Sequence, residues 1–205
     1  MLDFKNKKVL GMGLGLHGGG VGTVKFLAKE GAQITVTDLR SKKNLQPSLK
    51  KLTKIKNIKY VLGEHQLDDF LKADFVIKGP GVRPDSEFII LAKKRGIPVL
   101  NDIAIFLDRC PAKIIGVSGS RGKSTTSFLI WKFLQEKFMV WLAGNICKSV
   151  LELLPKIKAK DWVVLELSSF QLQDLADSGL EIKGKPEISV LINIYKEHLN
   201  WHKNP

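Results

Sequence analysis

Short apolar runs alternate with longer amphipathic segments along the whole chain. In the first half, the apolar runs predict strands at residues 8–10, 34–37, 59–62, 75–77 and 98–100. The amphipathic segments 24–29 and 86–95 predict helices between them. Strands that alternate with helices in this way usually form a parallel sheet that is covered by the helices.

The same pattern restarts near residues 109–112. Apolar runs predict four further strands at residues 114–117, 139–142, 162–165 and 188–192, and a helix over residues 125–137 follows the first of them. No internal repeat or low-complexity tract interrupts this order. The restart predicts two α/β domains, at residues 1–110 and 111–205.

Composition and charge narrow the class of protein. The 205 residues are 44% apolar, which is enough for two small cores, and the formal net charge of +13 comes from lysines spread over nearly every segment. This spread favours anionic small substrates over nucleic acid, which needs basic residues gathered on one element. Cys110 and Cys147 are isolated, which argues against disulfides and zinc. With neither a signal-peptide core nor a membrane-length apolar run, we expect a cytoplasmic protein with no membrane partner.

A glycine motif follows the first predicted strand. The sequence GLGLHG at residues 13–18 fits the G-x-G-x-x-G pattern, in which glycines let the backbone approach a phosphate at a helix N-terminus. Asp38 ends the second strand, where a contact to a ribose or a base is expected. The first half therefore predicts a Rossmann-like domain, with a simple packing turn as the alternative. The motif leaves the choice of nucleotide open.

A second phosphate motif, GVSGSRGKSTT, occupies residues 116–126. It departs from the usual G-x-x-x-x-G-K-[ST] loop because Val117 stands where the first glycine belongs. Backbone N–H groups of residues 119–122 can surround phosphate oxygens, Lys123 can neutralise their charge, and the Ser124 hydroxyl can bind Mg²⁺. The strand at 162–165 ends in Glu166, a candidate metal ligand. These features predict a P-loop-type ATPase domain that uses ATP and Mg²⁺.

Several motifs together resemble the Mur ligases, ATP-dependent enzymes that add amino acids to the peptidoglycan precursor. Their loop usually reads G-x-[ST]-G-[ST]-N-G-K-[ST]-[ST], so the displaced glycine is a feature of the family, whereas Arg121 replaces the usual Asn. The resemblance is to the branch that adds D-glutamate to UDP-N-acetylmuramoyl-L-alanine. The motifs that carry it are GLGL at 13–16, TDLR at 37–40, KGPGV at 78–82, GNI at 144–146, LELSSFQL at 165–172 and NIYKEH at 193–198.

The resemblance implies a role for each candidate site residue. ATP would lie on residues of the second loop, namely Gly119, Ser120, Arg121, Gly122, Lys123, Ser124, Thr125 and Thr126. The UDP-muramoyl-alanine substrate would contact Gly15, Leu16, His17, Asp38, Leu39, Arg40, Gly79, Asn145, Ser168 and Gln171. Metal ions would be held by Ser124, Glu166 and His198, and Lys123 and His198 would be catalytic.

Read without the resemblance, three of these residues have ordinary structural interpretations. His198 would cap the last strand, Ser168 would start a helix, and Gln171 would be an exposed helix residue. The resemblance also implies a carbamylated lysine and a third domain, which covers adenine and binds D-glutamate, beyond His198. We therefore expect this chain to be an N-terminal fragment with a truncated central domain, to be monomeric, and to lack ligase activity by itself.

Three other functions fit parts of the sequence. The motif at 13–18 with Asp38 also suits an NAD-binding dehydrogenase-like protein, but this leaves the second loop unexplained. A non-catalytic nucleotide-binding module fits both loops. A P-loop kinase fits the second loop, but it does not account for the SSFQL run.

Overall fold

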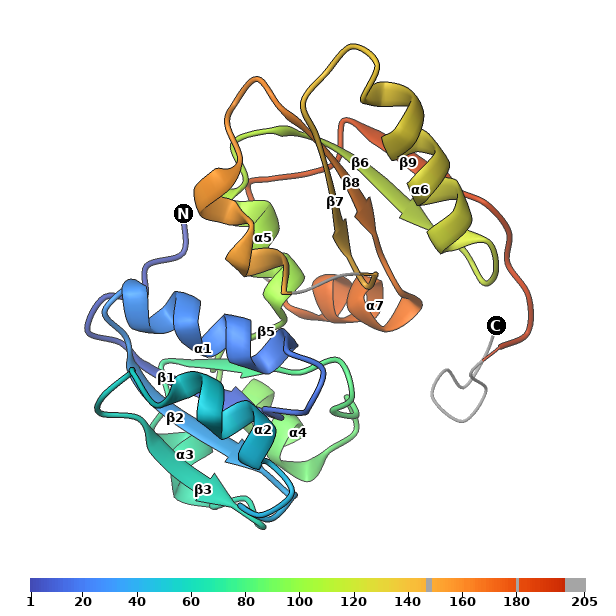
Figure 1. Cartoon of the computed structure of the whole chain (residues 1–205). Coiled ribbons are helices and arrows are strands. Elements are labelled where there is room, and N and C mark those ends of the chain that lie inside the picture. The colour runs from blue at the N-terminus through green and yellow to red at the C-terminus, as the bar shows by residue number, and fades with distance from the viewer. Residues whose placement is uncertain (147–148, 180, 198–205) are drawn as a thin grey trace.

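The first half of the chain folds into a five-stranded sheet. A computed structural model describes residues 1–146, 149–179 and 181–197 (Figure 1). All strand pairs in this sheet are parallel, in the order β3-β2-β1-β4-β5. The strands are β1 (Lys8–Met12), β2 (Gln33–Asp38), β3 (Lys59–Leu62), β4 (Phe75–Lys78) and β5 (Val99–Leu100). The helical segments are α1 (Gly19–Lys29), α2 (Gln46–Leu49), η1 (Lys50–Leu52), α3 (Leu67–Leu71) and α4 (Glu87–Lys94).

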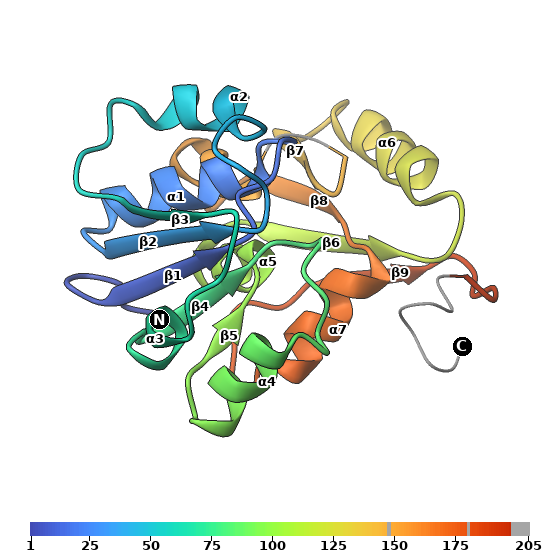
Figure 2. The ribbon, with the colours of Figure 1, turned by 90° about the horizontal axis from the view of Figure 1, so that it is seen from below.

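Both faces of this first sheet are covered. Val9, Ile34 and Val36 pack on the α1 side, whereas Leu10 and Val76 pack on the side of α3 and α4. Figure 2 shows α1 and α2 on one face and α3 and α4 on the other. This double coverage explains why the strands read as continuous apolar runs.

The second half forms a four-stranded parallel sheet in the order β7-β8-β6-β9. Helix α6 packs on one face, where Trp131 and Leu134 contact the cluster around Val117 and Val164. The strands are β6 (Lys113–Ser118), β7 (Val140–Gly144), β8 (Trp162–Glu166) and β9 (Ile188–Leu191). The helical segments of this half are α5 (Asp102–Arg109), α6 (Lys123–Leu134), η2 (Val150–Glu152), η3 (Leu154–Lys156) and α7 (Ser169–Asp177).

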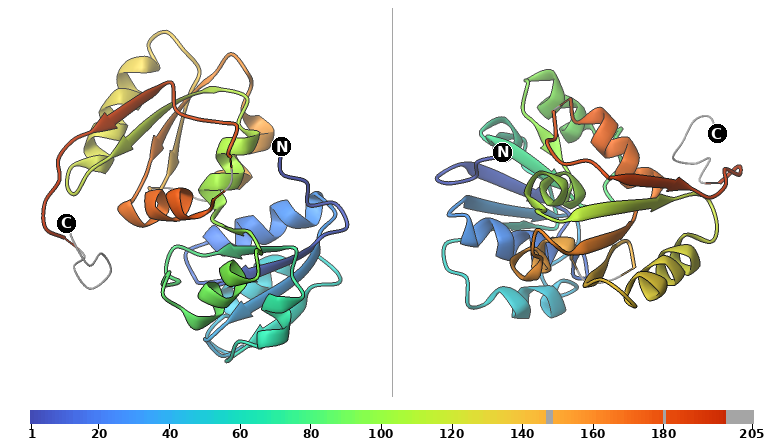
Figure 3. Two further views of the ribbon diagram at one scale, coloured as in Figure 1. Left: turned by 180° about the vertical axis from the view of Figure 1, so that it is seen from behind. Right: turned by 90° about the horizontal axis from the view of Figure 1, so that it is seen from above.

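Helix α5 lies between the two sheets. Its buried side chains Ile103 and Phe106 belong to one apolar cluster that also contains Val24 of α1 and Leu165 of β8. Both views in Figure 3 place this helix between the two layers of strands. The predicted domain division at residues 110 and 111 falls just after α5. It stays a prediction, because the core is continuous across it.

The predicted α/β architecture with parallel sheets is confirmed, but some elements differ from expectation. Helix α5 was not predicted; the Asn101 side chain caps it by accepting the Ala104 N–H at 2.9 Å. Helix α6 begins at Lys123, two residues before the predicted start, and ends at Leu134 rather than at residue 137. None of the helices in the described ranges has the length and apolar character that crossing a membrane requires.

Candidate nucleotide-binding site

The first glycine loop joins β1 to α1 in the strand–loop–helix arrangement that the motif predicts. Gly18 precedes α1 with a left-handed φ of 95°, and the helix has neither a side-chain cap nor an acidic residue in its first turn. A Cβ on Gly20 would lie 2.4 Å from the carbonyl oxygen of Leu14, so only glycine lets the helix start this close to the loop. The backbone N–H groups of the first turn are therefore suited to an anion.

Asp38 and Ser48 hold this loop by its backbone. The Asp38 side chain is buried; its Oδ2 accepts the Gly15 N–H at 3.0 Å, and its Oδ1 accepts the Arg40 N–H at 2.9 Å. The Ser48 hydroxyl donates to the Gly15 carbonyl at 2.6 Å. Oδ2 of Asp38 thus holds the glycine loop and Oδ1 holds the turn after β2, while Leu16, His17, Leu39 and Arg40 remain exposed. The predicted contact of Asp38 with a base stays a prediction.

The loop that follows β4 packs against the glycine loop at residues 13–18. The Gly79 N–H donates to the carbonyl of Met12 at 2.8 Å, and a Cβ on Gly79 would lie 2.9 Å from the Gly13 oxygen. A cavity of about 20 Å³ remains between these loops and the start of α1, lined among others by Lys78 and Asp102. The carboxyl ends of β1, β2 and β4 therefore meet at one place, where parallel α/β sheets bind ligands.

Burial at this cavity raises the pKa of Asp102 to about 6, although hydrogen bonds from the backbone N–H groups of Ile103 and Asp102 itself oppose the shift. A carboxyl group with a raised pKa favours the folded state at low pH, and this contribution is lost as the pH rises from about 4 through about 6. We therefore expect Asp102→Asn to raise the free energy of unfolding at pH 8, by at most about 3 kcal/mol, and to have little effect at pH 4.

Urea unfolding of the wild type and the Asp102→Asn variant at both pH values measures this difference. Asp3→Asn, which changes an exposed carboxylate, is the control and should show no pH-dependent gain. An equal effect of Asp102→Asn at pH 4 and pH 8 would mean that the pKa of Asp102 is not raised.

The second glycine loop, residues 119–122, joins β6 to α6, and the Lys123 side chain folds back onto the backbone of this loop. Gly122 precedes the helix with φ of 83°, and α6 again has neither a side-chain cap nor an acidic residue in its first turn. The Lys123 ammonium donates to the carbonyls of Gly119 and Ser120 at 2.7 and 2.8 Å. A phosphate that binds here would exchange these two hydrogen bonds for a charged partner.

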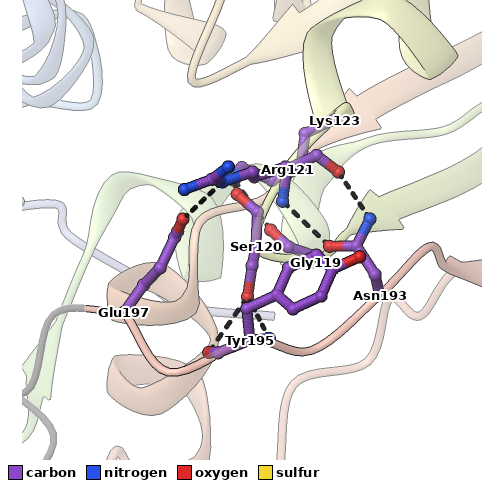
Figure 4. A network of polar contacts seen from close by, with 7 residues as sticks. All are labelled: Gly119, Ser120, Arg121, Lys123, Asn193, Tyr195 and Glu197. Atoms are coloured by element: carbon purple, nitrogen blue, oxygen red, sulfur yellow. Dashed lines mark hydrogen bonds and ion pairs between the residues drawn. The ribbon is translucent and has the colours of Figure 1, made fainter.

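The segment after β9 holds the second loop in place, as Figure 4 shows. The Asn193 side chain accepts the Arg121 N–H at 2.9 Å and donates to the Arg121 carbonyl at 3.0 Å. Ser120 and Tyr195 are joined by hydrogen bonds in both directions. The Arg121 side chain is 79% exposed, and its guanidinium forms an ion pair with Glu197 at 3.0 Å. Arg121 thus contributes its backbone to the loop and its charge to a neighbouring segment.

Asn193 was not among the predicted site residues. The available signal was its place at the end of an apolar strand, in the NIYKEH run that had been noted only as a motif. Because β9 lies beside β6, a polar side chain at the carboxyl end of β9 comes next to the loop that follows β6.

Glu166 ends β8 beside this loop. It is in register with Val117 of the neighbouring strand β6, and it is 2% exposed. Its Oε1 lies 3.5 Å from the Asn145 amide, and its Oε2 is buried with no hydrogen-bond partner within the described ranges. A buried carboxylate oxygen without a partner is costly in the free protein, and a bound cation would satisfy it. Mg²⁺ prefers oxygen ligands. Here they would be the Glu166 carboxylate and the hydroxyl of Ser124, an exposed residue that follows Lys123.

Asn145 reaches Glu166 because a glycine precedes it. Gly144 has φ of 100°, and a Cβ there would lie 2.0 Å from the Glu166 carbonyl oxygen. The Asn145 N–H donates to that oxygen at 3.1 Å. The structure thus brings together the predicted residues Asn145 and Glu166. His198, the third predicted metal ligand, lies outside the described residues, and no cluster of three potential metal-ligating side chains occurs within them.

Ser168 and Gln171 form a capping box at the start of α7. Ser168 is the N-cap, and the Gln171 Oε1 accepts the Ser168 N–H at 3.0 Å. The interpretation of Ser168 as a helix-start residue is confirmed. The interpretation of Gln171 as an ordinary exposed helix residue is wrong, because the capping box and the contact with α5 leave it 6% exposed.

Each half of the chain matches a known protein family. The Mur ligase MurD-like N-terminal domain matches residues 5–101, and the Mur ligase middle domain matches residues 117–205. The UDP-N-acetylmuramoylalanine–D-glutamate ligase of Roseiflexus sp. (strain RS-1) is 43% identical over 98% of this chain and 42% of its own length. The enzyme of the same name from Borreliella afzelii (strain PKo) is 41% identical over 98% of this chain and 43% of its own.

The chain therefore spans less than half the length of these relatives. Among solved structures, UDP-N-acetylmuramate:L-alanyl-gamma-D-glutamyl-meso-diaminopimelate ligase from Neisseria meningitides superposes with a TM-score of 0.54 at 19% identity, over 96% of this chain and 63% of that one. This likeness supports the fold. Since the two matched domains belong to one family and together account for nearly the whole sequence, the chain belongs to the Mur ligase family and carries its MurD-like N-terminal domain and its middle domain.

Proposed function

We propose that this chain supplies the uridine-nucleotide and ATP sites of a ligase that joins D-glutamate to UDP-N-acetylmuramoyl-L-alanine. The observation that carries the proposal is the pair of glycine loops, each placed between a parallel strand and an uncapped helix N-terminus. The loop at 13–18 would bind the UDP diphosphate, and the loop at 119–122 would bind ATP. The sequence similarity to D-glutamate ligases supports this choice of substrate.

The proposed reaction has two steps. The alanyl carboxylate of the UDP substrate attacks the γ-phosphorus of ATP, which gives an acyl phosphate and ADP. The amine of D-glutamate then adds to the acyl carbon, and phosphate leaves from the tetrahedral intermediate. Because an anionic nucleophile must approach an anionic phosphate, the site has to supply positive charge.

The described residues divide this task. The Lys123 ammonium can leave the carbonyls of Gly119 and Ser120 and neutralise the charge between the phosphates, while the backbone N–H groups of the loop bind phosphate oxygens. Glu166 and Ser124 would hold Mg²⁺, which supplies further positive charge when bound. Asn145 would orient the Glu166 carboxylate from the neighbouring strand. His198 is proposed as a further metal ligand and catalytic residue.

A binding comparison tests the nucleotide assignment of the first loop. We expect UDP-N-acetylmuramoyl-L-alanine to bind the 205-residue chain more tightly than NADH in a calorimetric titration. Asp38→Ala should weaken the binding of the UDP ligand by about tenfold, or about 1.4 kcal/mol, because the Gly15 N–H loses its acceptor and the loop loses its shape. Asp74→Ala is the control: it removes a carboxylate that accepts the Lys8 N–H at the opposite end of β1, and it should bind the UDP ligand normally. Tighter binding of NADH would favour the dehydrogenase-like alternative.

A further inference from the structure

A buried ion pair joins the two sheets close to the first glycine loop. The Lys78 ammonium lies 2.9 Å from the Asp174 carboxylate, and the two side chains are only 3% and 6% exposed. Lys78 ends β4 in the first sheet, whereas Asp174 lies on α7, which follows β8 of the second sheet. Burying two charges at this junction carries a considerable desolvation cost, so the ion pair need not stabilise the fold. Its effect on the relative positions of the two sheets is therefore the more informative property.

On the first-sheet side, Lys78 is part of the loop that closes on the glycine motif. Its ammonium also donates to the carbonyl of Val82 at 2.8 Å, which fixes the turn of residues 79–82. The Val82 side chain packs against Gly13, and Gly79 lies against the Gly13 carbonyl. The position of the Lys78 ammonium is therefore tied to the loop at 13–18.

On the second-sheet side, Asp174 lies one turn after the capping box of α7. Asn101 donates to the Gln171 carbonyl at 3.1 Å, one turn before Asp174. The same Asn101 caps α5. Lys78 and Asn101, both from the first half of the chain, thus contact the first two turns of α7, at Asp174 and Gln171.

We propose that Lys78 and Asp174 are positioning residues that set the distance between the UDP loop and the first turn of α7, where Ser168 and Gln171 would meet the muramoyl-alanine end of the substrate. This inference rests on the proposed function, because it assigns the two ends of one ligand to the two sheets. A ligand that spans both sites gains affinity only if both are held at the matching separation. UDP alone, which needs only the first loop, does not depend on that separation.

The test compares the affinity of UDP with that of UDP-N-acetylmuramoyl-L-alanine by calorimetry in the 205-residue chain. We expect the larger ligand to bind the wild type at least about tenfold more tightly than UDP. Asp174→Asn, which leaves the Lys78–Val82 contact in place, should remove most of this advantage and leave UDP affinity within about twofold. Lys78→Met should also remove the advantage, and because it loses the Val82 contact it should weaken UDP binding as well. Asp177→Asn is the matched control, since it removes the half-exposed contact of 3.5 Å between α7 and Lys93 of α4, and it should keep the full advantage.

A double variant separates positioning from stability. Replacement of one partner leaves a buried charge unpaired and is expected to lower the thermal midpoint, whereas Lys78→Met combined with Asp174→Leu removes both charges and should restore it. We expect the double variant to regain the thermal midpoint but not the affinity advantage of the larger ligand. Recovery of both together would mean that the pair serves only folding, and would overturn the proposal.

Hydrogen exchange of the free protein tests the same inference without any ligand. The Gln171 and Leu172 N–H groups bond to Ser168 in the first turn of α7, and their exchange should become about tenfold faster in Lys78→Met and in the double variant, but not in Asp177→Asn. Unchanged exchange would overturn the positioning role. If exchange accelerates but the wild type binds both ligands equally, the proposed substrate is wrong, whereas the junction still sets the position of α7.

Discussion

Replacement of Lys123 by alanine is expected to weaken Mg-ATP binding about 100-fold or more and to leave UDP-ligand binding unchanged. The ammonium is the charged group of the loop that would face the phosphates, and charge-assisted hydrogen bonds of this kind contribute about 1.5–3 kcal/mol each. Among the described residues, it donates to the carbonyls of Gly119 and Ser120, which are weaker partners than a polyphosphate. Calorimetric titrations of the 205-residue chain with each ligand measure both expectations.

The control for this variant is Lys132→Ala, which removes an exposed lysine from the same helix. The net charge of +13 attracts any anion, and both variants lower it by one. Lys132→Ala should therefore show how much of the loss in Mg-ATP affinity comes from the lower net charge alone. We expect it to change that affinity by less than about twofold. If Lys123→Ala weakened both ligands equally, the loop would be serving the fold rather than ATP.

The sequence was most informative where a local pattern determines a local structure. Apolar runs predicted the central strands β1, β4, β6 and β8 because residues buried on both faces of a parallel sheet must be apolar, whereas the apolar residues of the edge strand β9 are largely exposed. The glycine spacing predicted both strand–loop–helix turns, because left-handed φ values at Gly18 and Gly122 and the close approach at Gly20 admit few other residues. These features depend on neighbours within a few positions along the chain.

Contacts between distant segments could not be predicted in the same way. Asn193 hydrogen-bonds Arg121, which lies 72 positions away in the sequence, and Lys78 forms an ion pair with Asp174, which lies nearly 100 positions away. Each pairing therefore depends on which strands become neighbours in the fold. A lysine at the end of an apolar strand reads as exposed in sequence, because burial of its charge requires a partner supplied by the tertiary fold. Helix α5 was missed for a related reason: its apolar faces are all covered, since it lies between two sheets.

Glu166→Gln is expected to abolish most of the effect of Mg²⁺ on ATP binding while the protein remains folded. In the wild type, Mg²⁺ should increase ATP affinity by at least about 30-fold, since the Glu166 carboxylate would share the cation with the phosphates. The amide has nearly the same shape but lacks the negative charge. Titrations with ATP in the presence of Mg²⁺ and in the presence of EDTA measure the ratio for each protein, and the ratio for the variant should fall to within about threefold of one.

The stability of the free variant distinguishes a metal ligand from a structural carboxylate. Glu166 Oε2 is buried without a hydrogen-bond partner in the described part of the chain, so a neutral amide should be tolerated at least as well as the ionised group. We expect Glu166→Gln to keep or raise the thermal midpoint without Mg²⁺, by a few degrees if about 1 kcal/mol of desolvation cost is removed. Glu187→Gln changes an exposed carboxylate just before β9 of the same sheet and should alter neither the midpoint nor the response to Mg²⁺. A lower midpoint for Glu166→Gln, with the Mg²⁺ response retained, would show that Glu166 supports the sheet and that the cation is held elsewhere.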